Sequence, residues 1–227
     1  IDWIPSEIDG LRYDTGIESG SEISTFYDPM IAKIIAKGNN RQEAINKLNL
    51  ALKNTVVTGF TTNKNFLSAI LENSDFQAGN FNTHFLDKVF IYNGENYPQN
   101  TLDILTCTLQ HYRFLKRNDK RTIANGVPAG WRNNFYQAQN EKYAYQGFDF
   151  KVEYVNKNEY LEVSFAGKTF ISKFISNYDK VYIFEINNIR RSFYFSQNGN
   201  QYFISSPQLG QIQLNSVDRY PLQIEET

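Results

Sequence analysis

Residues 101–116 read TLDILTCTLQHYRFLK, and the spacing of apolar residues in this stretch decides the fold of the second half of the chain. At about 100° per residue, the apolar side chains would cover roughly 220° of a helix. They are Leu102, Ile104, Leu105, Cys107, Leu109, Tyr112, Phe114 and Leu115. A helix on a protein surface has a narrow apolar stripe, whereas here the narrow stripe is polar. It consists of Asp103, Thr106, Gln110, Arg113 and Arg117. The pattern therefore predicts a helix over 101–117 that other elements surround.

The sequence after this helix is a series of short segments, rich in aromatic residues, many of which alternate apolar and polar side chains. The segments are Asn133–Ala138, Lys142–Tyr145, Phe150–Val155, Tyr160–Phe165, Thr169–Ile175, Val181–Ile186, Ile189–Phe195, Tyr202–Ser205 and Gln211–Leu214. Alternation of this kind indicates strands with one buried face. Asn156–Asn158, Asn187-Asn188 and Asn198-Gly199 indicate tight hairpin turns between them. An antiparallel meander with the helix in its concave face satisfies both patterns.

The first ninety residues mix helix and strand signals. Short strands are predicted over 11–17, 22–25, 30–36 and 56–57. Asn40 lies three residues before Glu43, an arrangement that caps a helix, and a second apolar stripe runs from Phe66 to Leu71. The polar, turn-rich stretch 93–100 is a linker candidate. The chain is therefore predicted to have an α+β domain over 1–91 and a second domain over 92–227.

Composition excludes several classes of protein. The net charge is −1, from 23 basic and 24 acidic residues, and no basic stripe indicates a nucleic-acid partner. No apolar run approaches the roughly 20 residues that cross a bilayer. The single cysteine allows no internal disulfide, which fits a reducing compartment. We therefore expect a globular intracellular protein without nucleic-acid or membrane partners.

General motifs of catalysis are absent from the sequence. There is no glycine-rich phosphate loop, and neither His84 nor His111 has a second potential ligand at metal-binding spacing. Cys107 falls within the predicted buried helix, where a small core residue is expected more than a nucleophile. The residues alone thus indicate no active site.

Four short runs together resemble the C-terminal end of biotin carboxylase domains. They are residues 12–16 (RYDTG), 27–33 (YDPMIAK), 59–63 (GFTTN) and 83–86 (THFL). The second run, followed by Gly38 and Arg41, resembles a tyrosine-aspartate-x-methionine-isoleucine-x-lysine run of the family, and the others keep the family's spacing. The resemblance covers about residues 11–88.

The resemblance implies a fold for both domains. The first would be the small α+β C-terminal subdomain of biotin carboxylase. Continuation of the chain for more than 130 residues is similar to the biotin-containing alpha subunits of acyl-CoA carboxylases. In these subunits a domain joining carboxylase to carboxyltransferase follows, an antiparallel β-barrel wrapped around a long central helix. Residues 130–132 (GWR) and 221–222 (PL) resemble the methylcrotonyl-CoA carboxylase type more than the propionyl type.

The resemblance also implies a reaction for the parent enzyme. That enzyme carboxylates biotin with ATP, magnesium and bicarbonate, and passes the carboxyl group to an acyl-CoA. These 227 residues lack the family's phosphate, metal and bicarbonate ligands and its Ala-Met-Lys-Met carrier motif. We therefore expect this stretch alone to be an inactive assembly fragment, with no catalytic residue, metal or cofactor of its own. Only Thr83 and His84 would lie at the edge of the nucleotide pocket.

The implied partners are the carboxyltransferase (beta) subunit and the biotin carrier domain of the same chain, in a bacterial cytoplasm or a mitochondrial matrix. Arg12 and Asp28 are expected at an interface or facing each other. The stretch 118–131 is expected to contact the carboxyltransferase subunit, because long loops are usually functional or disordered. It holds four apolar residues of the kind found at interface centres, Ile123, Val127, Pro128 and Trp131. In the alternative, Trp131 plugs the end of the barrel.

Two other functions fit a sheet curled around a helix. An aromatic-rich barrel of the lipocalin type would bind a small apolar molecule, and it requires an open interior cavity. A thioesterase-like enzyme would need a carboxylate or histidine placed for acyl transfer, for which the helix offers only His111.

Overall fold

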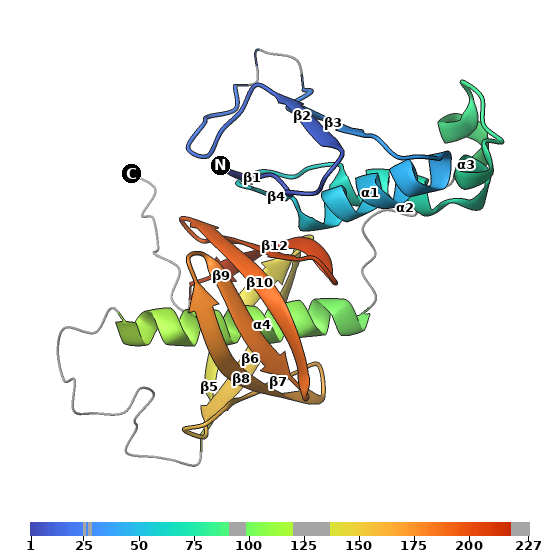
Figure 1. Ribbon diagram of the computed structural model, residues 1–227. Coiled ribbons are helices and arrows are strands. Elements are labelled where there is room, and N and C mark those ends of the chain that lie inside the picture. The colour runs from blue at the N-terminus through green and yellow to red at the C-terminus, as the bar shows by residue number, and fades with distance from the viewer. Residues whose placement is uncertain (25, 27–28, 91–98, 120–136, 219–227) are drawn as a thin grey trace, which may run out of the picture. The chain divides into compact units, whose positions relative to one another are not determined.

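The computed structural model describes residues 1–24, 26, 29–90, 99–119 and 137–218. The chain divides into two compact units (Figure 1). Unit 1 comprises Ile1–Tyr97 with Ser205–Gln211, and unit 2 comprises Pro98–Ile204 with Ile212–Thr227. The predicted division between residues 91 and 92 lies outside the described residues. None of the helices in the described ranges combines the length and the apolar character that crossing a membrane would need.

Unit 1 is a small α+β unit. Its elements are β1 (Asp2–Ile4), β2 (Leu11–Thr15), β3 (Ala32–Ala36), α1 (Arg41–Asn54), β4 (Val56–Thr58), α2 (Lys64–Glu72), α3 (Ser74–Ala78) and the π-helical turn η1 (Phe85–Val89). Strand β1 pairs with β4 and β2 pairs with β3, both antiparallel. The strand predicted over 22–25 is wrong for its described part, because residues 22–24 pair with no strand. They follow a turn in which Ser21 N donates to Glu18 O at 3.0 Å.

The start of helix α1 explains part of the sequence pattern. The side-chain oxygen of Asn40 accepts a hydrogen bond from Glu43 N at 2.9 Å, which confirms the predicted cap. A Cβ atom on Gly38 would lie 2.6 Å from Ala44 N, so this position requires glycine. The apolar face of α1 buries Ile45 together with two residues of its last turns. The start of α1 is thus set by the cap at Asn40 and the close approach at Gly38, and its buried face is set by the 3.6-residue spacing of its apolar side chains.

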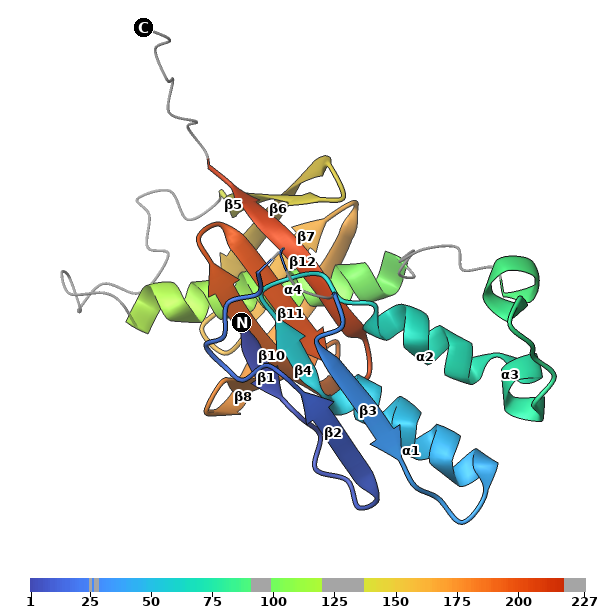
Figure 2. The ribbon, with the colours of Figure 1, turned by 90° about the horizontal axis from the view of Figure 1, so that it is seen from above.

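Unit 2 is a closed barrel around one helix, as predicted (Figure 1). Its elements are α4 (Gln99–Asp119), β5 (Gln139–Tyr145), β6 (Phe148–Asn156), β7 (Leu161–Phe165), β8 (Lys168–Tyr178), β9 (Val181–Ile186), β10 (Ile189–Asn198), β11 (Gln201–Ser206) and β12 (Gly210–Val217). Each strand pairs with the next, and β12 pairs antiparallel with β5 to close the ring. Figure 2 shows the same ring of strands around α4 from a second side. The first predicted strand, 133–138, lies largely outside the described residues.

The hairpin turns follow the sequence signals. Asn187 and Asn188 both adopt positive φ, 48° and 67°, which asparagine tolerates better than most residues. This geometry matches the twist of the two flanking strands, β9 and β10. Gly199 also has a positive φ, and a turn over residues 166–167 that no sequence signal predicted joins β7 to β8. The predicted asparagine-rich turns are therefore confirmed.

Helix α4 is buried on its polar side as well as its apolar side. Leu105 and Leu109 are completely buried, and so are Asp103, Thr106 and Gln110 of the predicted polar stripe. The sequence predicted a surrounded helix but did not say what would become of that stripe. Because the barrel closes on every side, the stripe meets strands instead of solvent. The helix occupies the interior that a lipocalin-type ligand would need, so that alternative is not supported.

Candidate functional site

Buried polar groups need hydrogen-bond partners, and strands of the barrel supply them to some of those on α4, whereas Thr106 Oγ1 and Gln110 Nε2 are buried without one among the described residues. Lys168 Nζ lies 2.6 Å from the carboxylate of Asp103. The hydroxyl of Tyr143 donates to Gln110 Oε1 at 2.7 Å. These contacts favour one rotation of α4 about its axis, since turning the helix would separate Asp103 from Lys168 and Gln110 from Tyr143.

His111 and Cys107 have structural roles in the same interior. His111 Nδ1 lies 2.7 Å from Ser172 Oγ on β8, and burial lowers the pKa of His111 to about 4. Burial raises the pKa of the Cys107 thiol, which keeps it protonated and unreactive. The thioesterase-like alternative needs a substrate-accessible base, but His111 is 5% exposed and held by Ser172. That alternative therefore finds no support at this position.

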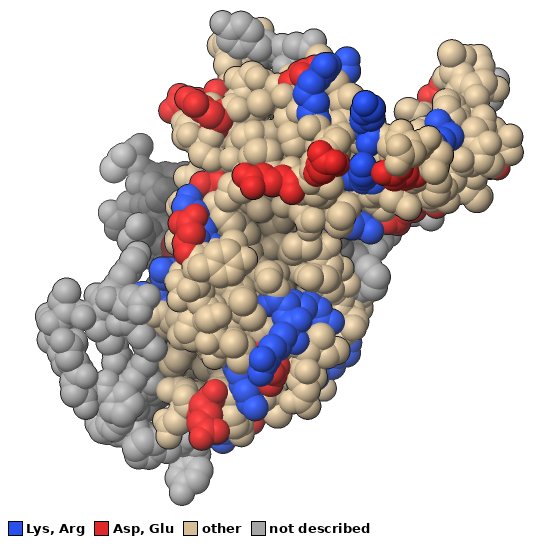
Figure 3. All heavy atoms as spheres, in the orientation of Figure 1, with Lys and Arg blue, Asp and Glu red and all other residues tan. Residues whose placement is uncertain are grey.

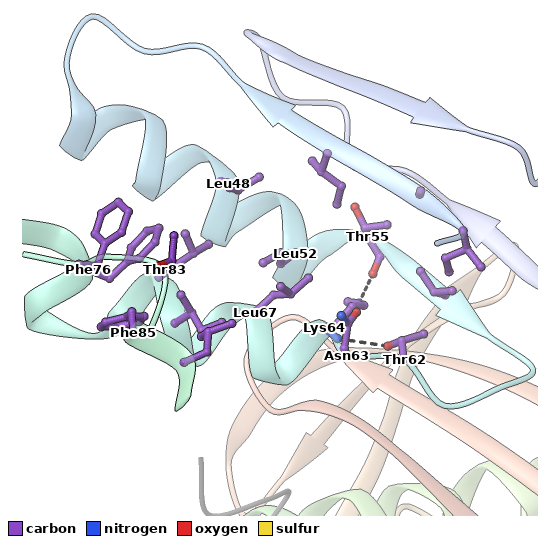
Figure 4. Close-up of a pocket in the computed structure, with 18 of the residues that line it drawn as sticks. Leu48, Leu52, Thr55, Thr62, Asn63, Lys64, Leu67, Phe76, Thr83 and Phe85 are labelled. Carbon is purple, nitrogen blue, oxygen red and sulfur yellow. Dashed lines mark hydrogen bonds between the residues drawn. The ribbon is translucent and has the colours of Figure 1, made fainter. Parts of the chain in front are cut away.

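Unit 1 contains an apolar pocket of about 520 Å³ (Figure 4). Its middle is lined by Leu48 and Leu52 from α1 and by Leu67 from α2. Polar side chains lie at its two ends, with Lys64 near one end and Thr83 near the other (Figure 4). A mostly apolar hollow with a few polar groups is the usual form of a small-molecule or side-chain binding site.

Lys64 is the ionisable group at the first end of the pocket. Its ammonium group donates a hydrogen bond to the carbonyl oxygen of Thr55, the residue that ends α1. Burial lowers the pKa of Lys64 to about 8. In the sequence, Lys64 lies three residues before Leu67 and seven before Leu71, on the same face of α2. A lysine on an apolar helix face was the signal that could have found this end of the pocket.

The second end of the pocket is built by aromatic rings. Phe76 of α3 stacks on Phe81 with ring centroids 4.9 Å apart, and Phe85 contacts both rings. The guanidinium of Arg41 lies over Phe76 and Phe81, 5.1 and 5.2 Å from their centroids, and donates to Phe76 O at 2.7 Å. Arg41, part of the family-like sequence pattern, thereby holds α3 against α1. Thr83 is exposed and lines the pocket beside these rings.

The structure separates the two residues predicted at the nucleotide edge. Thr83 lines the pocket, whereas His84 is exposed and is not one of its lining residues. The backbone N–H of His84 donates to Asn82 Oδ1 at 2.9 Å, so the position serves to start η1. Thr83 thus lines the pocket and its neighbour His84 does not, a difference that the sequence run THFL could not show.

The predicted interface residues are only partly within the described chain. Arg12 is exposed and pairs with Asp14 at 3.1 Å, its neighbour two positions along β2. Asp28 lies outside the described residues, and so do four residues of the predicted carboxyltransferase contact, Ile123, Val127, Pro128 and Trp131. The expected roles of Arg12 and Asp28 at an interface therefore stay predictions.

The charges of the described residues favour neither a metal site nor a polyanion surface. Within the described ranges, no group of three or more histidine, cysteine, aspartate and glutamate residues could hold a metal ion. On the face seen in Figure 3, basic and acidic side chains are interspersed among uncharged residues. This distribution agrees with the near-neutral net charge of −1.

Known proteins match the first part of the chain. Residues 2–88 match the family described as Biotin carboxylase C-terminal domain. The mitochondrial propionyl-CoA carboxylase alpha chain of Caenorhabditis elegans is 42% identical over 86 residues, which are 38% of this chain and 12% of that protein. The mitochondrial methylcrotonoyl-CoA carboxylase subunit alpha of Arabidopsis thaliana is 42% identical over 93 residues, 40% of this chain and 13% of that protein.

A solved structure of Rhizobium etli pyruvate carboxylase aligns with 60% of this chain and 14% of its own, at 24% identity. Its TM-score of 0.39 is too low to support an argument about the fold. The chain spans only 12% and 13% of the length of the two curated relatives.

Proposed function

We propose that residues 2–88, which match the family described as Biotin carboxylase C-terminal domain, are such a domain of a biotin-dependent carboxylase alpha chain, and that the whole chain connects carboxylase to carboxyltransferase in such an enzyme. The parent enzyme would carboxylate biotin with ATP, magnesium and bicarbonate and then carboxylate an acyl-CoA. The described residues would contribute assembly, not chemistry. The observation that carries the proposal is α4 enclosed by the barrel, the architecture expected of a joining domain.

The physical basis of the joining role is rigidity. A helix held by strands all around, with buried contacts at Asp103, Gln110 and His111, has one rotation and one depth in the barrel. Any segment that leaves the C-terminal end of such a helix starts from a fixed position. A fixed starting point lowers the ordering entropy that a partner must overcome on binding.

The apolar pocket of unit 1 fits part of a nucleotide site. Thr83 offers a hydroxyl beside apolar and aromatic walls, which suits the edge of an adenine ring. Within the described residues no metal-ligand group lies there to hold magnesium and phosphates. We therefore place only the adenine edge at Thr83 in the proposal, and ATP hydrolysis depends on residues of the parent enzyme beyond this pocket.

The proposed acyl-CoA is of the methylcrotonyl type, and the partners are the carboxyltransferase (beta) subunit and the biotin carrier domain of the parent chain. Support for the type comes from residues 130–132 and 221–222. The two relatives of different substrate name are each 42% identical, so overall similarity does not distinguish them. Both relatives have mitochondrial in their names, and we propose the mitochondrial matrix for a eukaryotic source and the cytoplasm for a bacterial one.

Deletion of residues 122–128 in the complete alpha subunit tests the joining role. We expect a folded subunit that no longer co-purifies with the carboxyltransferase subunit. Phe148→Asp is the control, because Phe148 is 79% exposed on the barrel and its replacement adds a charge without touching the core. Retained co-purification of the deletion variant would refute the proposal, and an unfolded product would favour the alternative in which Trp131 plugs the barrel.

A further inference from the structure

A polar network joins the last turns of α4 to the first two strands of the barrel. The guanidinium of Arg117 pairs with Glu141 of β5, and its Nη1 donates to the hydroxyl of Tyr154 of β6 at 2.9 Å. That hydroxyl in turn donates to Gln139 Oε1 at 2.7 Å. Arg113, one helical turn earlier, lies 3.7 Å from Glu141. The end of one helix is thus joined to two strands.

The network brings together residues from the two sides of the stretch 120–136, which itself lies outside the described residues. Arg117 precedes this stretch on α4, and Gln139 is the first residue of β5 after it. Arg117 is also the last residue of α4 whose side chain the structure describes. The proposed contact with carboxyltransferase, 118–131, therefore begins directly after Arg117, and the chain returns to the same network at β5.

Tyr154 is the centre of the network. It is buried, and its ring packs against that of Phe114 with centroids 6.2 Å apart. Burial raises the pKa of Tyr154, so the hydroxyl stays protonated and can donate to Gln139 while it accepts from Arg117. A side chain fixed in the interior thus orients the polar groups on both sides of the stretch 120–136.

Stabilisation of the fold explains only part of this arrangement. The side chain of Arg117 is 46% exposed, and an ion pair with so exposed a member contributes little to the free energy of unfolding. The helix dipole favours a cation in the last turn of α4, but it does not require contacts with two different strands. Other contacts, those of Asp103 and Gln110, already hold the middle of the helix. The network therefore acts on the end of α4, where helices fray most readily.

We propose that Arg117, Glu141 and Tyr154 are positioning residues for the contact with the carboxyltransferase subunit. The inference rests on the joining role proposed above and names the residues that hold that contact in place. With the end of α4 tied to β5 and β6, the chain leaves unit 2 and returns to it at one fixed place, so less conformational freedom is lost when the partner binds. Without the tie the last turn of α4 frays, and the partner has to order it.

The affinity of the complete alpha subunit for the carboxyltransferase subunit, measured by isothermal titration calorimetry, tests the proposal. We expect Arg117→Met to weaken the complex about tenfold, the cost of ordering one or two further side chains. Tyr154→Phe, which keeps the ring and removes the hydroxyl, should weaken it by a similar factor. The double variant should bind little worse than either single one, because both substitutions break the same network. Arg190→Met is the control: it breaks another arginine–glutamate pair of the barrel, at 2.8 Å from Glu185, and should bind like the wild type.

Hydrogen exchange of the free subunit separates positioning from a loss of structure. In Arg117→Met the amides of residues 115–118 should exchange faster, while the strands of unit 2 keep their wild-type protection. Arg117→Lys keeps the charge opposite Glu141 but loses the planar donor, and its affinity should lie between those of the wild type and Arg117→Met. A wild-type subunit that does not bind carboxyltransferase would overturn the joining role and the positioning role with it. Equal affinities of the wild type and Arg117→Met, or weaker binding accompanied by lost protection in the strands, would overturn the positioning role alone.

Discussion

Leu109→Ala tests the central packing of the barrel. Leu109 is completely buried on α4. The substitution removes three carbons, and at about 0.8 kcal/mol for each the transfer contribution is about 2.4 kcal/mol. A cavity of roughly 60 Å³ that the barrel cannot close adds about 1.4 kcal/mol, at about 24 cal/mol per Å³. We expect the free energy of unfolding of unit 2 to fall by about 2.4–3.8 kcal/mol, because a closed ring of strands cannot contract around a missing side chain.

The assay is urea unfolding of the whole chain followed by amide signals of both units, with the strands of unit 2 reporting Leu109→Ala and helix α1 reporting the control in unit 1. Two units can unfold in separate steps, and a single averaged signal would then mix them. Leu50→Ala is the control: it is the same substitution in a helix, but Leu50 is 49% exposed. Its effect should stay below about 1 kcal/mol. A loss below about 1 kcal/mol for Leu109→Ala would refute the account of a tightly filled barrel.

Three further predictions concern other contacts. The free energy of unfolding should fall by up to about 3 kcal/mol as the pH drops from 7 to 4. The cause is that His111 has its usual pKa of 6.5 in the unfolded chain but a pKa of about 4 in the folded chain, so protonation favours the unfolded chain. Unfolding titrations of His111→Gln at each pH should show that this part of the pH dependence is lost. Lys168→Met should lower the free energy of unfolding of unit 2, measured in urea, by about 1–3 kcal/mol, because it leaves the buried Asp103 without its cation. Gln99 still donates a hydrogen bond to Asp103 at 2.7 Å. Lys151→Met, which breaks an exposed ion pair, is the control and should cost less than about 1 kcal/mol. Gly38→Ala should lower the melting temperature of unit 1, because the added Cβ would lie 2.6 Å from Ala44 N and costs about 1–3 kcal/mol, and an unchanged melting temperature would show that α1 begins differently.

Periodicity in the sequence was sufficient to predict the enclosed helix and the antiparallel meander, and the resemblance to the carboxylase family implied that the meander forms a barrel. The apolar arc of 101–116 was too wide for a surface helix, and the segment Val181–Ile186 was predicted with the bounds that β9 has in the structure. Other strands are a few residues longer in the structure than predicted. Their ends depend on hydrogen bonding to the neighbouring strand, which local composition does not determine. The short elements β1, α3 and η1 were missed, since a few residues carry no measurable period.

The site was harder to predict than the fold. Thr83 was expected at the edge of a nucleotide pocket, and it lines the apolar pocket of unit 1, whereas His84 is not one of the lining residues; the nucleotide role of both residues stays a prediction. Lys64 was not predicted as a pocket residue, because the sequence of α2 was interpreted only by its apolar stripe.

Direct binding of the 227-residue chain to the carboxyltransferase subunit tests the proposed joining role most directly. The measurement is isothermal titration calorimetry on the two purified proteins, with the variant that lacks residues 122–128 as the control. The account predicts a saturable complex with the unaltered chain and a loss of that complex with the deletion. A folded chain that shows no heat of binding and elutes separately from the carboxyltransferase subunit would contradict it.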